Sequence, residues 1–253
     1  MLRVAGSAAG DHRDVHRRRY RPCDRQIIAR VRAVGVHAGQ HDLAGPQRFS
    51  EPRTRRALTN IEFCVDISGS MMASFGSGNR YDGAMAAIDN FLDKRKGDAF
   101  GLTFFGNNVL HWVPLTSDTT AIRCAPPFMR PEVRPAWFGG TEIGKALLAC
   151  RDVLRQRDEG DRMLVLVSDG ESSDFSGGNE VEIAETLRRD GIILYCIHVA
   201  EDETPGEVVN VASITGGAAF QADDPGALQD VFARIDGMQQ TKLEKVASET
   251  LDD

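Results

Sequence analysis

Small hydroxyl and carboxylate side chains follow two apolar runs of this 253-residue sequence. Asp66, Ser68 and Ser70 come directly after the first run, and Asp169 comes directly after the second. Thr141 lies between them in the sequence, behind a pair of glycines at the start of a predicted helix. All five residues offer oxygen atoms, and neither histidine nor cysteine occurs among them. They are therefore the candidates for a site that binds a cation.

The two carboxylates favour a hard divalent cation. Two converging carboxylates repel each other, and a proton or a cation has to offset that repulsion. The hydroxyl groups add neutral oxygen ligands, which suit Mg²⁺ because this ion takes few protein ligands and keeps several waters. Mn²⁺ and Ca²⁺ are the alternatives, whereas Zn²⁺ is expected to recruit imidazole or thiolate ligands. The expected metal ligands are Asp66, Ser68, Ser70, Thr141 and Asp169.

The elements that must position these residues alternate along the chain. Runs of apolar residues predict strands, and apolar residues three and four positions apart predict amphipathic helices. The predicted strands are 60–66, 99–105, 109–115, 162–168, 192–198 and 218–221. The predicted helices are 80–94, 141–156, 179–190, 205–214 and one that begins near residue 225.

This alternation predicts a three-layer, doubly wound, Rossmann-like α/β fold. Strands that are apolar throughout are typical of a mostly parallel central sheet with helices on both faces. A short Gly-Asn-Asn turn joins strands 99–105 and 109–115, which predicts one antiparallel strand at an edge of the sheet. In such sheets ligands bind beyond the carboxyl ends of the strands. Asp66 and Asp169 both lie at such ends, so we expect the candidate site there.

Charge divides the chain near residue 58. Residues 1–58 contain 13 arginines, no lysine and five acidic residues, whereas the remainder contains 17 basic and 32 acidic residues. We expect residues 1–57 to be an arginine-rich, disordered leader, residues 58–240 to be the folded domain and residues 241–253 to be a C-terminal tail. The arginine cluster at 17–21 leaves nucleic-acid binding as an alternative role for the leader. We expect no nucleic-acid partner.

The cysteines and the apolar runs indicate the cellular compartment of the protein. The number of cysteines is odd and no C-x-x-C pair occurs, which favours reduced thiols that mostly fill the core. The longest apolar run, 192–197, is six residues, far below the roughly 18 to 20 needed to span a bilayer. The first residues do not form a signal peptide. We therefore expect a cytoplasmic protein. The cysteines are Cys23, Cys64, Cys124, Cys150 and Cys196.

The motifs DISGS, GGTEIG and VLVSDGE occur here in sequence order. Over about residues 59–240 the chain resembles the von Willebrand factor A (VWA, integrin I-like) domain and its metal-ion-dependent adhesion site. The resemblance implies that Ser68 and Ser70 bind the metal directly. It also implies that Asp66 and Asp169 often act through bound water, and that Thr141 alternates between the two modes. A Glu or Asp of a partner protein would then fill the open position on the metal, so such a site binds and does not catalyse.

A narrower resemblance concerns bacterial VWA proteins of the aerotolerance (Bat) type. It is carried by IEFCVDISGSM, the PLT at 114–116, GGTEIG and the segment AAFQADDPGALQDVFARID. Bat-type proteins are usually encoded near MoxR-type AAA+ ATPases, which implies such an ATPase as partner. Their flanking transmembrane helices have no counterpart here, so membrane attachment is not visible in this chain.

An enzyme is the alternative. An aspartate after the first strand, a threonine and a later aspartate also describe a Mg-dependent phosphotransferase or phosphatase of the haloacid-dehalogenase type. That chemistry needs a second acid two residues after the nucleophile, where this sequence has Ser68. It also needs a lysine between the motifs, for which only Lys145 is suitably placed. We therefore expect no enzymatic activity.

One aromatic residue lies close to the candidate site in the sequence. Trp137 follows an irregular, proline-rich stretch and precedes Thr141 by four positions. Two interpretations are open, contact with a partner protein and packing within the loop.

Overall fold

A computed structural model describes residues 58–170, 172–175 and 177–249 of the chain, and the expected leader lies outside the described residues. Six strands form one sheet in the order β5-β4-β1-β6-β7-β8. All neighbouring strands are parallel except β4 and β5, which are antiparallel. The predicted fold class is confirmed. The strands are β1 Thr59–Asp66, β4 Ala99–Phe105, β5 Val109–Thr116, β6 Asp161–Ser168, β7 Ile192–His198 and β8 Ala218–Gln221.

Strand β1 lies at the centre of the sheet and sets the position of the first motif. Every residue of β1 is buried, as expected for a strand with neighbours on both sides and helices on both faces. Asp66 pairs with Phe105 at the end of β4, and Val65 pairs with Val167 near the end of β6. This register brings the carboxyl ends of β1, β4 and β6 to one edge of the sheet.

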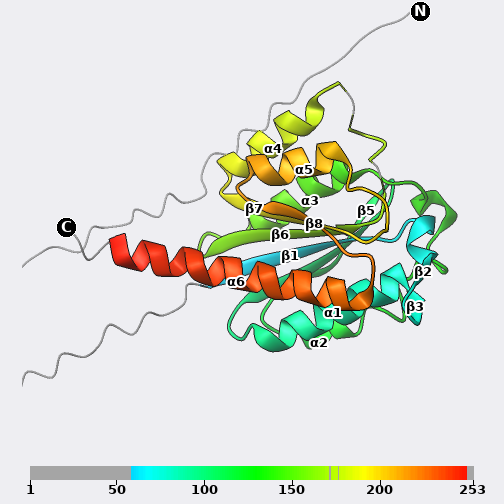
Figure 1. The fold of residues 1–253 in the computed structure, drawn as a ribbon, viewed down its shortest axis with the longest axis horizontal. Helices are drawn as coiled ribbons and strands as arrows, with labels where there is room; N and C mark the ends of the chain where they lie inside the picture. Colours follow the sequence, from blue (N-terminus) through cyan, green and yellow to red (C-terminus); the bar gives the residue numbers. More distant parts are fainter. Residues whose placement is uncertain (1–57, 171, 176, 250–253) are drawn as a thin grey trace, which may run out of the picture. The chain divides into compact units, whose positions relative to one another are not determined.

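Helices cover both faces of the sheet (Figure 1). Helices α1 (Arg80–Lys94) and α6 (Pro225–Glu249) lie on one face. Helices α3 (Ile143–Leu154), α4 (Asn179–Arg189) and α5 (Gly206–Ile214) lie on the other. None of the helices within the described ranges is both long and apolar enough to cross a membrane.

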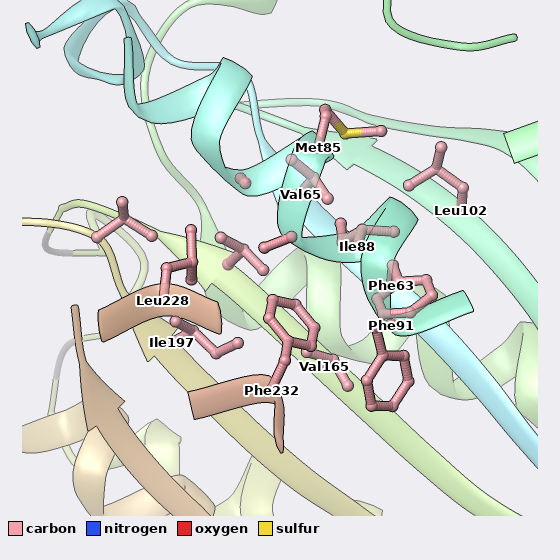
Figure 2. Packing of buried hydrophobic residues seen from close by; sticks show 14 of the residues in the cluster. Phe63, Val65, Met85, Ile88, Phe91, Leu102, Val165, Ile197, Leu228 and Phe232 are labelled. Atoms are coloured by element: carbon pink, nitrogen blue, oxygen red, sulfur yellow. The ribbon is translucent and has the colours of Figure 1, made fainter. Parts of the chain in front are cut away.

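Aromatic packing joins α1 and α6 to the sheet (Figure 2). The ring of Phe63 from β1 meets that of Phe91 from α1 edge-on, with the centroids 6.0 Å apart. Phe232 from α6 lies 5.3 Å from Phe91 and 6.4 Å from Phe63. Burial of each such side chain contributes roughly 2 kcal/mol to stability. This cluster fixes both helices on the face that Figure 2 shows.

The opposite layer contains the buried cysteines. Cys64, Cys150 and Cys196 are free and buried, and Cys124 is free and exposed. Burial raises the pKa of the Cys64 and Cys196 thiols, so both stay protonated. Cys23 lies outside the described residues.

The structure differs from the sequence expectation at the start of one helix and in the loops. Helix α3 begins at Ile143 and not at residue 141. Helix α6, for which the sequence predicted only the start, runs from Pro225 to Glu249. Five short elements were not expected, because two to four residues carry no periodic pattern. They are the 3₁₀ helices Gly69–Met72 and Ala136–Phe138, the strands β2 Ser74–Phe75 and β3 Gly78–Asn79, and helix α2 Thr120–Arg123.

Candidate metal site at the carboxyl edge of the sheet

Asp66 is the innermost residue of the site. It ends β1, is fully buried, and accepts hydrogen bonds on both carboxylate oxygens. The backbone N–H of Ser68 donates to Oδ1 at 2.7 Å, and the hydroxyl of Ser168 donates to Oδ2 at 2.7 Å. The carboxylate is therefore held by its own loop on one side and by the end of β6 on the other.

A chain of hydroxyl groups connects the first motif with Asp169. Ser68 Oγ lies 2.9 Å from Ser70 Oγ, and Ser70 Oγ donates to Asp169 Oδ1 at 2.7 Å. Ser70 is exposed, whereas Ser68 and Asp169 are buried. The structure thus joins four of the five predicted site residues through hydrogen bonds. They lie at the edge of the sheet where the carboxyl ends of β1 and β6 meet.

The second oxygen of Asp169 belongs to an ion pair. Arg80 is the first residue of α1, and its Nη1 lies 2.6 Å from Asp169 Oδ2. The Asp169 side chain is 0% exposed and the Arg80 side chain is 20% exposed. Sequence reasoning missed Arg80. The signal that could have found it is its place at the start of the helix that follows the first motif, because a helix in a doubly wound sheet begins near the carboxyl edge.

Thr141, the fifth predicted residue, is placed by its backbone. Its carbonyl oxygen accepts hydrogen bonds from the N–H and the hydroxyl of Ser173, both at 2.9 Å. The N–H of Glu142 donates to the carbonyl of Gly106 at 2.9 Å, directly beyond β4. Within the part of the chain that the structure describes, no hydrogen bond joins the Thr141 hydroxyl to the other four predicted residues. The structure therefore brings the Thr141 segment to the same edge of the sheet without linking its side chain to them.

Two glycines allow this segment to approach the sheet. A Cβ atom on Gly106 would lie 2.2 Å from the carbonyl oxygen of Phe138 and 3.1 Å from that of Gly140. Gly140 has a φ of 87°, which places it in the left-handed region that side chains with a Cβ rarely adopt. The backbone before Thr141 thus needs glycine at both positions.

Asp174 caps helix α3 from a different loop. Its carboxylate accepts the N–H of Gly144 at 3.1 Å and that of Lys145 at 2.8 Å, and Ser172 also donates to it. A carboxylate on the first N–H groups of a helix satisfies groups that have no partner within the helix. This contact explains why α3 begins after Glu142, and it ties the loop that follows β6 to the segment that carries Thr141.

Burial makes the charge of Asp66 costly. Desolvation raises the pKa of Asp66 to about 6, and hydrogen bonds from Ser168 and Ser68 oppose that rise. The neighbouring Asp169 raises the pKa further. A cation close to both carboxylates would offset this cost, so the buried and hydrogen-bonded oxygen set fits a divalent ion.

The chemistry of the donors fits a hard cation. In the described part of the chain, no group of three or more His, Cys, Asp or Glu side chains is placed to hold a metal ion. A cation at this edge would therefore rest on two carboxylates together with hydroxyl oxygens and water, which suits Mg²⁺ better than a thiolate- or imidazole-seeking metal. The residues that could hold it are Asp66, Ser68, Ser70 and Asp169, with Thr141 from the adjoining segment.

The chain is similar to known proteins in sequence and in fold. Residues 61–171 match the sequence model of the von Willebrand factor type A domain. A curated relative, an uncharacterized protein of Borreliella burgdorferi, is 23% identical over 233 residues, which cover 80% of this chain. The matched region spans 65% of the length of that relative.

Three solved structures have the same fold. BatB from Bacteroides thetaiotaomicron gives a TM-score of 0.60 at 20% identity and covers 74% of this chain and 99% of its own. An aerotolerance-related membrane protein from Bacteroides fragilis gives a TM-score of 0.59 at 19% identity, and the match covers 70% of this chain and 97% of that protein's chain. Proximal thread matrix protein 1 from the mussel byssus gives a TM-score of 0.59 at 21% identity, and the match covers 70% of this chain and 44% of that protein's chain. Zinc occupies the metal-ion-dependent adhesion site motif of that protein.

The sequence match, the strand order and the fold of these neighbours thus confirm the predicted resemblance to the VWA domain. Domains of this family commonly mediate metal-dependent protein interactions. Residues 61–171 of the chain thus match the von Willebrand factor type A domain in sequence, and the described domain has the α/β fold of these neighbours.

Proposed function

We propose that this domain is a protein interaction module that binds an acidic residue of a partner through a divalent cation. The observation that carries the proposal is the hydrogen-bonded series of Asp66, Ser68, Ser70 and Asp169, which leads from a fully buried carboxylate to an exposed hydroxyl. A cation at Ser70 would be reachable from outside, while the charges that hold it stay shielded from water.

Each residue has a role in this proposal. The hydroxyls of Ser68, Ser70 and Thr141 supply neutral oxygen ligands, and Asp66 and Asp169 supply the negative charge. When bound, Mg²⁺ would supply one open coordination position that accepts a carboxylate oxygen of the partner. Because neutral ligands outnumber charged ones, the ion keeps enough positive charge to attract that carboxylate.

The match to the von Willebrand factor type A domain supports a metal-dependent protein interaction, and the ion and the partner are our proposals. The zinc reported in the adhesion site of the mussel protein supports cation binding by this fold. We propose Mg²⁺ for this chain, with Mn²⁺ and Ca²⁺ as alternatives, because its donors are all oxygen atoms. We also propose a MoxR-type AAA+ ATPase as the partner, in line with the Bat-type resemblance of the sequence.

The haloacid-dehalogenase alternative finds little support in the geometry. A nucleophilic aspartate has to reach a phosphate, but Asp66 is 0% exposed and both of its oxygens already accept hydrogen bonds. Lys145 Nζ donates to the carbonyl of Asn107 and pairs with Glu142, so it is engaged away from Asp66. We propose that the domain binds and does not catalyse.

Titration calorimetry with MgCl₂ tests the metal site. We expect one site in the full chain, abolished by Asp66→Ala and strongly weakened by Thr141→Ala. Thr119→Ala is the matched control, because Thr119 is a half-buried threonine at the start of α2 whose side chain makes no capping hydrogen bond. Absence of divalent-ion binding to the unmodified protein would contradict the proposed site.

Capture of a purified MoxR-type ATPase tests the partner. We expect capture in Mg²⁺, loss of capture in EDTA and loss with Thr141→Ala. Circular dichroism should show an unchanged fold in both cases, because Thr141 carries no charge and is half-buried. Equal capture under all three conditions would exclude a metal-bridged contact.

A further inference from the structure

We propose that Val133 and Trp137 form an apolar rim beside the metal site, and that the rim selects a partner segment in which a large apolar residue adjoins the acidic one. The inference rests on the proposed function and specifies its partner. The side chains of Val133 and Trp137 are 61% and 65% exposed, and that of Phe128, which lies in the same segment, is 65% exposed. The other large apolar side chains that are exposed in the described part of the chain are 36–46% exposed. The most exposed apolar groups thus gather in one segment, which is typical of an interaction surface.

This segment adjoins the candidate ligands at its C-terminal end. Trp137 precedes Thr141 by four residues, and its carbonyl accepts a hydrogen bond from Asn108 Nδ2 at 3.0 Å. The ring of Trp137 rests edge-on against the buried Phe138, with the centroids 5.5 Å apart. The close approach of Gly106 to Phe138 holds the same turn against the end of β4. The indole is therefore anchored at one side while most of its surface faces solvent.

The middle of the segment adjoins the first motif. A Cβ atom on Gly69, which lies between the two candidate serine ligands, would meet Arg134 Nη2 at 3.4 Å. Arg134 is half-buried, and its Nη1 donates to the carbonyl of Pro131. Val133 precedes Arg134 and is exposed, so the backbone that carries its side chain runs past the same loop. In Figure 1 the green segment between α2 and α3 accordingly lies beside the cyan turn that follows β1.

Polar contacts hold this segment in place at the start of α1. Arg130 pairs with Asp82 at 2.8 Å and stacks over the ring of Tyr81 at 5.6 Å. Glu132 accepts a hydrogen bond from Asn79 Nδ2 at 3.0 Å. The exposed rim side chains thus belong to a loop that these contacts hold in one place. An anchored surface loses less conformational entropy on binding than a mobile one, which favours a binding role.

The charge beside the rim selects for an acidic partner. The guanidinium of Arg134 lies next to the loop of Ser68 and Ser70, and its Nε is buried without a hydrogen-bond partner. A carboxylate that approaches the metal position would meet a positive charge there as well as the cation. The apolar rim lies next to this charge, so a partner residue that adjoins the acidic one would be buried against the rim if it is apolar. Tryptophan and arginine are among the side chains that most often dominate the binding energy of interfaces.

Peptide display gives a direct test. A library of random 12-residue peptides is selected on the full chain in MgCl₂, and the bound peptides are eluted with EDTA. We expect Glu or Asp in the eluted peptides, with Phe, Trp, Leu or Met enriched within two positions of the acid. Acidic peptides without an apolar preference would overturn the rim but leave the proposed function intact. Failure to recover acidic peptides would overturn both.

Variants then separate the rim from the metal. For a selected peptide, Trp137→Ala should weaken binding about tenfold, while the affinity for Mg²⁺ alone, measured by calorimetry, stays unchanged. Val209→Ala on α5 is the control, because Val209 is 40% exposed on a helix of the opposite layer. Equal peptide affinity of Trp137→Ala and wild type would overturn the proposal. So would a magnesium-dependent dimer that Trp137→Ala dissolves, because the rim would then bind a second copy of the chain.

Discussion

Arg80 and Asp169 form an ion pair within the candidate metal site, with Nη1 and Oδ2 2.6 Å apart. The other oxygen of Asp169 accepts the hydroxyl of Ser70. Both oxygens of this carboxylate thus have a partner in the protein. The hydrogen bonds that Asp66 accepts come from a backbone N–H and a hydroxyl and not from a cationic side chain. The pair lowers the net negative charge that a divalent ion would meet.

Arg80→Gln should tighten Mg²⁺ binding. Removing the guanidinium takes a positive charge away from the site, and the gain in attraction should increase the affinity roughly threefold to tenfold, limited by the partial exposure of Arg80. Titration calorimetry measures this directly. Arg80→Lys is the matched control, since it keeps the charge and should stay close to wild type. A weaker affinity in Arg80→Gln would mean that Arg80 serves mainly to hold Asp169 in position.

Glu62→Gln should change how stability depends on pH. Burial raises the pKa of Glu62 from 4.5 to about 8, with a bond from the Thr103 hydroxyl opposing the rise. The folded protein therefore holds this proton more tightly than the unfolded chain does. The stabilising contribution is complete below about pH 4.5 and is lost as the pH rises through about 8.

Urea unfolding between pH 5 and pH 9 measures this effect. The wild type should lose stability as the pH rises, whereas Glu62→Gln should remain on the order of 2 kcal/mol more stable at pH 9. His111 also contacts Thr103, and burial lowers its pKa. His111→Gln is therefore a useful control: it removes a group whose contribution to stability rises with pH up to about 6.5, so the profile should change below that pH and keep the slope of the wild type above it. Parallel pH profiles for wild type and Glu62→Gln would refute this prediction.

Gly106→Ala should destabilise the protein and disturb the Thr141 segment. The added Cβ would lie 2.2 Å from the backbone oxygen of Phe138, and a backbone atom cannot move aside as a side chain does. We expect a loss of roughly 2 kcal/mol in the free energy of unfolding. Gly206→Ala is the control, because nothing lies within 4 Å of its Cβ position. Equal midpoints of denaturation for the two variants would contradict the close approach.

Asp174→Ala should loosen the start of α3. It removes the acceptor for the N–H groups of Gly144 and Lys145, which should cost about 1 kcal/mol of stability. Hydrogen exchange at these two amides should rise as well. Asp118→Ala removes a comparable contact to Thr120 at the short and exposed α2, and should cost less. An unchanged exchange rate at Gly144 would argue against the cap.

Much of the fold follows from the sequence because its strands are apolar on both faces. Strand β1 is buried along its whole length, and the apolar run of its residues predicted the strand, whereas its central place in the sheet is known only from the structure. The end of such a strand places Asp66 at the carboxyl edge, and the same logic holds for Asp169. The short β2–β3 hairpin escaped prediction because two-residue strands leave no alternation to detect.

Contacts between residues that are far apart in the chain could not be predicted from the sequence. The pair of Arg80 and Asp169 joins residues that are 89 positions apart, and no local pattern encodes it. The buried Glu62 is a similar case, since its environment depends on the neighbouring Thr103 and on Gly101, where a Cβ would lie 1.9 Å from its Oε2. Sequence periodicity reports which face a residue occupies and does not report its partner across the sheet.

The course of α6 has a consequence for how the domain can be tethered. The helix starts beyond the end of β8, at the edge that carries the candidate site, and its 25 residues extend about 37 Å towards the opposite edge, where β1 begins. Both ends of the described domain therefore leave from the edge opposite the site. A linker, a surface or a bulky fusion attached at either end would hold the domain with its binding edge facing outward.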